Sequence, residues 1–233
     1  MTGRELKEYR KNSRLTQDEA AKVLGVSQTY LSLLESDKRR LTERLKKKLV
    51  KKMHVRPTEL PAKTKDHKVT KVSDDQLTGD LAALGYKGFS HWKPSQLKNP
   101  ADVLLSALNA DKRDARLVEA LPWLLFEFPD LEWNSVVMTA KAYDLQNRLG
   151  FVTNVAKRMA ERYGNETTAQ KLETVESKLE RSRLEKEETL CKETMTQTER
   201  KWLKVQRPES AKHWNLLTDL SPQHLNWQYY VTT

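Results

Sequence analysis

The chain has 233 residues, enough for one or two domains with a buried core, and it carries a net charge of +10. Residues 1–56 hold 16 lysines and arginines against 7 aspartates and glutamates, so the rest of the chain is close to neutral. A positive field concentrated on one small module is typical of phosphate binding. The single cysteine, Cys191, excludes an intramolecular disulfide and a cysteine-rich zinc site.

The N-terminal sequence MTGRELKEYR lacks the apolar core of a secretory leader. No stretch approaches the roughly 18 consecutive apolar residues of a membrane span. We therefore expect no membrane partner and a cytoplasmic location, with association with the nucleoid if the basic module binds DNA.

Few runs alternate between apolar and polar residues, and the chain has only seven glycines and eight prolines. This pattern predicts an all-α fold with essentially no sheet. Residues 61–73, PAKTKDHKVTKVS, are charged and poor in apolar side chains, and they predict a solvated linker. The linker separates an N-terminal domain, residues 1–60, from a second helical region.

Helix boundaries in the second region are marked by capping residues. Ser73 and Gln76 form a capping-box pattern that starts a helix at about Asp74. The pair Asn99-Pro100 opens another helix, and Asp111 precedes a third. Apolar residues then recur at helical spacing until Gly164. These signals predict a bundle of four or five helices over residues 74–164, which we expect to serve dimerisation or partner binding.

Residues 165–233 are predicted to form a charged helix and an aromatic tail that bind a partner. Leu172, Val175 and Leu179 give a stripe too short for a stable coiled coil, so this helix is either solvated or ordered by a partner. The tail is too apolar to remain in water. It docks either on the bundle or on another protein, and its aromatic residues are Trp202, Trp214, Trp227, Tyr229 and Tyr230.

Residues 16–35, TQDEAAKVLGVSQTYLSLLE, carry the most specific pattern in the chain. Thr16 and Glu19 form a capping box for a first helix, and Gly25 suits the positive φ of a sharp turn. Ser27 caps a second helix that begins at Gln28. Two short helices joined by such a turn are typical of a helix-turn-helix motif.

These residues resemble the XRE family, which includes Cro and the phage repressors, over about residues 3–60. The first helix of the family is matched by ELKEYRKNSRLTQ, the fourth by LTERLKKKLVKKM, and the short fifth by the stretch from Pro57. The resemblance implies a five-helix domain that binds double-stranded operator DNA. It also implies a structural pair between Arg10 and Glu35, and a position for Gln17 where the family binds a phosphate and braces the recognition helix.

The resemblance and the residue chemistry together predict two kinds of DNA contact. Base edges would be contacted from the start of the second motif helix, by Gln28, Thr29 and Ser32. Phosphates would be held by Gln17, Ser27, Lys38, Arg39, Arg40 and, in addition, Arg14. A glutamine amide can bond adenine bidentately, so Gln28 is the main candidate for base discrimination. The family commonly has a glycine in the loop after this helix and this chain has none, which leaves the path of the loop open.

Catalytic and metal-binding patterns are missing from the sequence. The histidines lack HExxH or paired ligand spacing, and Gly79, Gly85 and Gly88 do not follow a strand as a dinucleotide-binding fingerprint would. We therefore expect no enzyme activity, no cofactor and no metal.

Three stretches within residues 81–161 are similar to the C-terminal region of XRE-type regulators encoded beside nucleotidyltransferase-like toxins of the abortive-infection class. They are LAALGYKGFSHW, ALPWLLFEFPDLEW and DLQNRLGFVTNVAKRMAE. This similarity implies a homodimeric, autoregulatory repressor that is also the antitoxin of a cognate toxin protein. Two alternatives stay open: an interaction protein for which DNA binding is secondary, and a regulator of a metabolic operon whose bundle holds an effector.

Overall fold

The computed structural model describes residues 1–60, 67 and 69–230. Helices make up nearly all of the regular structure in this part of the chain, which confirms the predicted all-α class. The described residues form two compact units. One unit contains residues 1–60 and 96–99, and the other contains the remaining described residues. Residues 61–66 and 68 of the predicted linker lie outside the described residues.

The N-terminal unit contains four α-helices and one short 3-10 helix. Their bounds are α1 Gly3–Asn12, α2 Gln17–Leu24, α3 Gln28–Glu35, α4 Glu43–Met53 and η1 Pro57–Glu59. Each α-helix turns one apolar stripe inward, and the core contains Leu6, Leu24, Leu31, Leu34, Leu49 and Leu60. The predicted short fifth helix is a single 3-10 turn, η1, in which Leu60 N donates to the Pro57 carbonyl.

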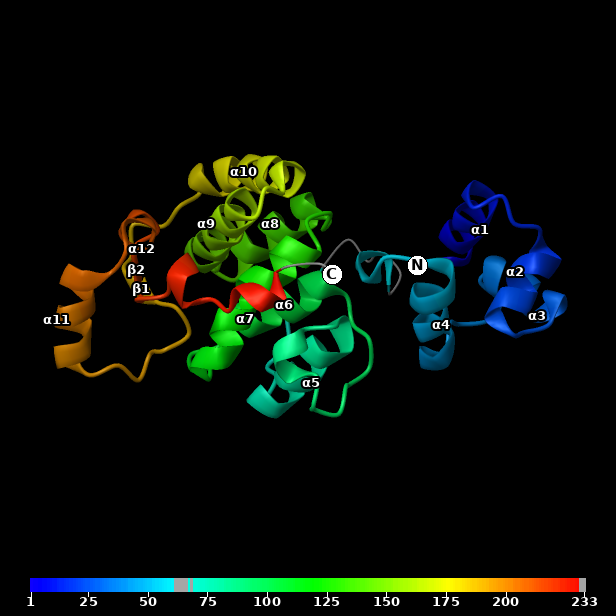
Figure 1. Ribbon diagram of the computed structural model, residues 1–233, viewed down its shortest axis with the longest axis horizontal. Helices are drawn as coiled ribbons and strands as arrows, with labels where there is room; N and C mark the ends of the chain where they lie inside the picture. The colour runs from blue at the N-terminus through cyan, green and yellow to red at the C-terminus, as the bar shows by residue number, and fades with distance from the viewer. Residues whose placement is uncertain (61–66, 68, 231–233) are drawn as a thin grey trace. The chain divides into compact units, whose positions relative to one another are not determined.

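The second unit is a helical bundle with a few short additions (Figure 1). Its α-helices are α5 Asp74–Leu84, α6 Pro100–Leu108, α7 Ala115–Glu127, α8 Trp133–Ala142, α9 Gln146–Arg162, α10 Glu166–Glu180, α11 Gln197–Gln206 and α12 Glu209–His213. Its 3-10 turns are η2 Lys87–Phe89, η3 Pro222–His224 and η4 Trp227–Tyr229. The two-residue strands β1 Glu188–Thr189 and β2 Leu216–Leu217 pair in parallel, and they are the only sheet among the described residues.

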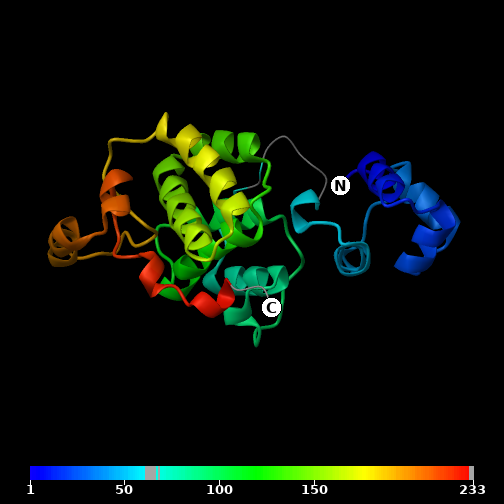
Figure 2. The same cartoon turned by 45° about the horizontal axis from the view of Figure 1, so that its top comes forward.

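Helix α9 is the central helix of this bundle, and α7, α8, α10 and α12 pack against it. Figure 2 shows α9 beside α10 and α8. Polar side chains of α9 fix the chain that follows α10. Arg148 donates to the Leu108 and Ala110 carbonyls and forms an ion pair with Glu188, whereas Asn147 exchanges two hydrogen bonds with the backbone of Leu184. Buried polar groups need such partners, so these bonds specify one path for residues 184–188.

The start of α7 differs from the prediction. The N-cap is Asp114, whose carboxylate accepts from the Arg116 amide, and not Asp111. Residues 111–113 instead pair with residues 191–193: Glu193 N donates to the Asp111 carbonyl and Arg113 N donates to the Cys191 carbonyl. A tertiary pairing that is invisible in the local sequence therefore delays the helix. The Ser73 cap of α5 is confirmed, since its hydroxyl accepts from Gln76 N, but the return bond from the Gln76 side chain that a capping box requires is not formed.

Helix α10 belongs to the bundle, although its stripe was predicted to be too short for a coiled coil. Leu172, Val175 and Leu179 are each no more than 2% exposed, because α9 supplies the opposing apolar face. A short stripe suffices when the partner helix lies in the same chain.

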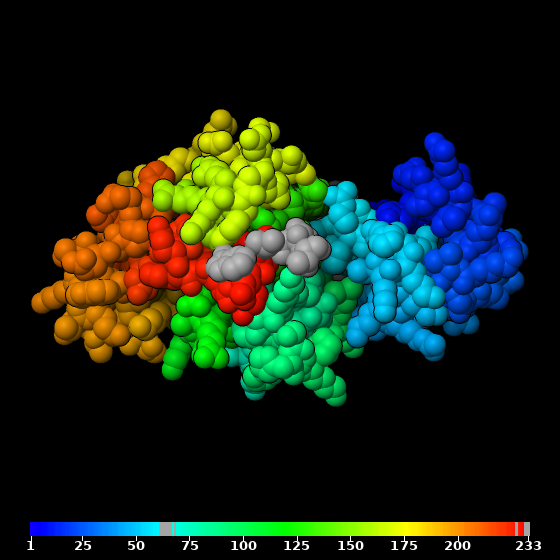
Figure 3. Space-filling model, viewed as in Figure 1, coloured from blue at the N-terminus to red at the C-terminus, as the bar shows by residue number. Residues whose placement is uncertain are grey.

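The sequence left open whether the tail docks on the bundle or on another protein. In the structure the tail packs on the bundle. The indole of Trp214 is fully buried, and its ring lies so close to Gly150 of α9 that a Cβ added there would come within 2.4 Å. In Figure 3 the C-terminal segment, coloured red, lies between the yellow-green α9 and α10 and the teal and green α5 and α7. Trp202 on α11 is an exception, with 57% of its surface exposed. The side chain of Trp227 lies outside the described residues.

Candidate nucleic-acid interface

Helices α2 and α3 are held in place by the local signals that the sequence shows. Thr16 and Glu19 form a complete capping box, with Glu19 N donating to Thr16 Oγ1 and Thr16 N donating to Glu19 Oε2. Gly25 ends α2 with φ of 62°, and Ser27 Oγ accepts from Tyr30 N at 3.1 Å. The predicted caps and the predicted turn are confirmed, and they orient α3 relative to α2.

A buried network connects α1, α2 and α3. Arg10 Nε donates to Glu35 Oε1 at 2.6 Å and Arg10 Nη2 donates to Glu35 Oε2 at 3.1 Å, so the predicted pair is confirmed as a bidentate one. Gln17 Nε2 donates to the same carboxylate at 3.0 Å. Burial acts to raise the pKa of Glu35, but the hydrogen bonds from Arg10 and Gln17 outweigh it and leave the pKa lowered. The carboxylate that ends α3 is therefore ionised and fixed.

Gln17 lies where the resemblance places it, at the first residue of α2 and half-buried. Its amide nitrogen is directed at Glu35, which accounts for the bracing of α3. A contact between Gln17 and a phosphate stays a prediction.

The polar residues at the start of α3 lie on its outer face. Ser27, Gln28, Thr29 and Ser32 are all exposed, whereas Leu31 and Leu34 face the core. Positions 28, 29 and 32 are neighbours on a helix surface because residues four apart stack one above the other. The structure therefore brings the three predicted base-reading side chains together on one exposed surface.

The N-terminus of α3 lacks a compensating carboxylate. Helices α1, α2 and α4 each carry an acidic residue in the first turn, namely Glu5, Asp18 with Glu19, and Glu43, but α3 carries none. The positive end of the α3 dipole therefore has no negative side chain in the first turn of the helix. This end of the motif can therefore accept an external anion such as a phosphate.

The loop after α3 follows a defined path without a glycine. Asp37 adopts φ of 56°, a conformation that aspartate tolerates better than most residues. Its carboxylate accepts from Gly3 N at 2.6 Å, and Lys38 N and Arg39 N both donate to the Leu33 carbonyl. The side chains of Lys38, Arg39 and Arg40, which follow α3 in the chain, are exposed. Arg14, in the loop after α1, is also exposed.

Sequence reasoning missed the role of Gly3. A Cβ on this residue would lie 2.3 Å from the Leu34 carbonyl oxygen and 2.7 Å from the Glu35 carbonyl carbon. Only glycine lets the first turn of α1 approach the end of α3 this closely. The sequence did contain a signal for this close approach, namely a glycine in the first turn of a helix, between the capping-box residues Thr2 and Glu5.

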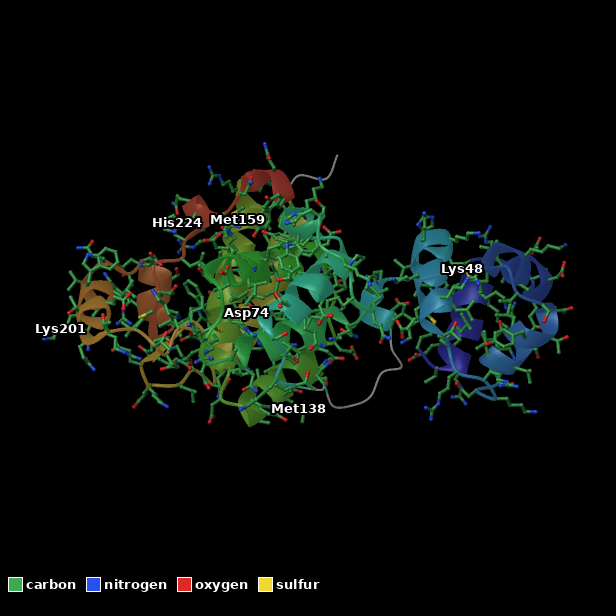
Figure 4. All side chains as sticks on the ribbon, turned by 90° about the horizontal axis from the view of Figure 1, so that it is seen from below. Lys48, Asp74, Met138, Met159, Lys201 and His224 are labelled. Carbon is green, nitrogen blue, oxygen red and sulfur yellow. The ribbon has the colours of Figure 1, made fainter. Side chains whose placement is uncertain are left out.

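Helix α4 adds a further tie and further positive charge. Lys48, labelled in Figure 4, donates to the Leu24 carbonyl at 2.5 Å and thereby caps the C-terminus of α2. Four other basic side chains of α4 are exposed: Arg44, Lys47, Lys51 and Lys52. The site therefore lies on a unit whose surface is broadly cationic.

In the part of the chain that the structure describes, no group of three or more His, Cys, Asp or Glu side chains is placed to hold a metal ion. None of the described helices combines the length and the apolar character that crossing a bilayer requires.

Residues 6–60 match the model of the helix-turn-helix family. The match covers the motif described above and runs from within α1 to the end of η1. It supports the resemblance of this N-terminal unit to XRE-type regulators, and with it a DNA-binding transcription regulator. No curated protein and no solved structure matched the chain.

Proposed function

We propose that the chain is a sequence-specific transcriptional repressor that inserts the start of α3 into the major groove of double-stranded DNA. The observation that carries this proposal is the exposed N-terminal face of α3, with three polar side chains and no acidic residue in its first turn. A major groove admits an α-helix, and polar side chains on its first turns reach the base edges.

The contacts divide by chemistry. The polar side chains of Gln28, Thr29 and Ser32 can form hydrogen bonds with base edges. The amide of Gln28 can donate one hydrogen bond to adenine and accept another from it at the same time. The proposed phosphate contacts come from the exposed cations Lys38, Arg39, Arg40 and Arg14, from the exposed Ser27, and from the half-buried Gln17. Such contacts fix register without reading sequence.

The repressor acts as a homodimer in this proposal. A unit of four short helices reads only a few base pairs, so two copies are needed for a specific site. The operator is then an inverted repeat with half-sites about 10–10.5 base pairs apart, or a multiple of that spacing. The second unit is the candidate for the dimer contact, since the first presents α3 to DNA.

The antitoxin role rests on the similarity of residues 81–161 alone and stays a prediction. In that role, the second unit binds a cognate toxin and the operator lies upstream of the gene pair. The interaction-protein and metabolic-regulator alternatives differ from it in what the second unit binds.

Genome-wide mapping of DNA bound by the full chain, combined with identification of co-purifying proteins, tests the proposal. The expected result is a small set of sites that share an inverted repeat, one of them upstream of the chain's own gene. Enrichment without any shared motif would contradict sequence-specific repression. A toxin-like protein among the co-purified material would support the antitoxin role.

A further inference from the structure

The second unit contains a cavity of about 500 Å³ that the repressor proposal does not use. It is lined by residues of α5, η2, α7 and the C-terminal turns η3 and η4. Asp74 and His224, which line it from α5 and η3, are labelled in Figure 4. The volume falls in the range of about 300–1,000 Å³ that is usual for sites of small organic ligands.

Aromatic rings form one side of the cavity. Tyr86 lies 5.2 Å from Phe89 and 5.0 Å from Tyr229 between ring centroids, both in edge-to-face geometry. Gly88 lies against these rings, since a Cβ there would come within 2.6 Å of Tyr86 and 3.3 Å of Tyr229. Trp92 also lines the cavity and is 43% exposed. Ring faces of this kind attract cations through their quadrupoles.

Carboxylates outnumber cations on the rest of the lining. Asp74, Asp75, Asp114 and Glu119 face a single arginine, Arg116, with two histidines, His91 and His224. Two of the four carboxylates have structural partners: Asp74 pairs with Arg113 at 2.8 Å, and Asp114 caps α7.

Of the two carboxylates without a partner among the described residues, Asp75 is exposed and Glu119 is half-buried. Glu119 lies on α7 and makes no hydrogen bond or ion pair with any described residue. Burial raises the pKa of Glu119, and the charges of His224 and Arg116 only partly oppose this effect. A half-buried acid without a partner costs folding free energy, which a bound cation would offset.

An independent feature is the hydroxyl of Tyr230. This side chain lines the cavity and is 97% buried, with 3% of its surface exposed, yet its hydroxyl has no hydrogen-bond partner among the described residues. Buried hydroxyls are nearly always bonded, and this oxygen has less than 1 Å² of accessible surface, so a ligand reaches it only if the cavity wall adjusts.

We propose that this cavity binds a small organic ammonium ion whose apolar body contacts the aromatic rings and whose charged head lies near Glu119. The ring faces and the excess of carboxylates both favour a cation. An anion would find one arginine against four carboxylates. The second unit is in this view an effector-binding unit.

Three probes of one shape and different charge test the proposal on the full chain at neutral pH: benzylamine, benzyl alcohol and benzoate. Binding is measured by calorimetry and by the shift of the thermal transition, since a ligand that binds the folded state stabilises it. We expect benzylamine to bind at least tenfold more tightly than benzyl alcohol, and benzoate to show no binding. Equal binding of the amine and the alcohol, or a preference for benzoate, would overturn the proposal.

Charge-removing variants locate the site. Glu119→Gln keeps the shape and removes a partnerless charge, so it should fold at least as well as the original chain. It should reduce benzylamine affinity tenfold while leaving benzyl alcohol unchanged, and Asp75→Asn should act in the same direction. Glu161→Gln, on the exposed end of α9 and away from the cavity, is the matched control and should change nothing. Unchanged amine binding in both Glu119→Gln and Asp75→Asn would place any binding elsewhere and reject the site.

Discussion

Arg10 and Glu35, 25 residues apart in the chain, meet in a bidentate ion pair with N–O distances of 2.6 and 3.1 Å. Gln17 donates to the same carboxylate, so α1, α2 and α3 are all bonded at one point. Because Glu35 is the last residue of α3, this carboxylate fixes the helix that we propose to enter the major groove. The network connects the stability of the unit to the position of the proposed DNA-binding face.

Removing one partner of the pair should destabilise the N-terminal unit. Arg10→Ala leaves the Glu35 carboxylate, 8% exposed, with Gln17 alone, and an uncompensated buried charge costs about 3–5 kcal/mol. All six tryptophans lie beyond residue 90, so their fluorescence does not report on this unit. Amide hydrogen exchange of residues 1–60 should be used, and it should accelerate at Leu31 and Leu34.

The exposed pair of Asp18 and Lys22 on α2 is the control. Both side chains are largely in solvent, and pairs of this kind contribute little. Asp18→Asn should leave the exchange rates unchanged. Equal effects of Arg10→Ala and Asp18→Asn would mean that the buried network does not hold the unit together.

Acid should loosen the same unit. The pKa of Glu35 is lowered in the folded state, so its contribution to stability is present above the unfolded value of about 4.3 and is lost as pH falls through the lower folded pKa. Exchange protection at pH 7 should therefore exceed that below about pH 4. In Glu35→Gln the pH dependence should become shallower, and an unchanged dependence would assign it to other carboxylates.

Gly3→Ala should displace α3. The new methyl group would meet the Leu34 carbonyl oxygen at 2.3 Å, and backbone cannot move aside as a flexible side chain can. Overpacking of this kind costs about 1–3 kcal/mol. We expect lower exchange protection in α3 and weaker DNA binding together, whereas Lys11→Ala on the exposed end of α1 should change neither.

The tail should act as core. Trp214→Ala removes a fully buried indole that packs against α9, and such truncations cost about 3–5 kcal/mol. Trp202→Ala is a matched control, because it removes the same side chain from a position that is 57% exposed. Denaturant unfolding followed by circular dichroism should show a large loss for the first and almost none for the second. A loss of similar size in both variants would mean that α11 is also part of the core.

Local signals in the sequence were sufficient for the helix-turn-helix motif. The Thr16 capping box, the positive φ at Gly25 and the Ser27 cap depend on neighbouring residues, which sequence displays directly. The resemblance supplied the Arg10–Glu35 pair, which no local pattern indicates. Asp37 shows a limit, because an aspartate in the left-handed region cannot be told from an ordinary turn residue by its neighbours.

Long-range contacts explain the remaining differences. The start of α7 depends on pairing with residues 191–193, and the burial of α10 and of Trp214 depends on the apolar faces of α9. Apolar stripes indicate that a helix needs a partner, but they do not say whether the partner lies in the same chain. For that reason sequence alone could not choose between core and interface for residues 165–233.

The central claim is that exposed side chains at the start of α3 read bases while the cations after it hold phosphates. Affinity of the full chain for its mapped operator and for a scrambled duplex, measured over a range of salt concentrations, tests it most directly. Gln28→Ala should lose about 1–3 kcal/mol on the operator alone, and the control Asn12→Ala nothing. Lys38→Ala should weaken binding to both duplexes and reduce the salt slope by about one. Equal losses on operator and scrambled DNA for Gln28→Ala, or an unchanged slope for Lys38→Ala, would contradict this division of contacts.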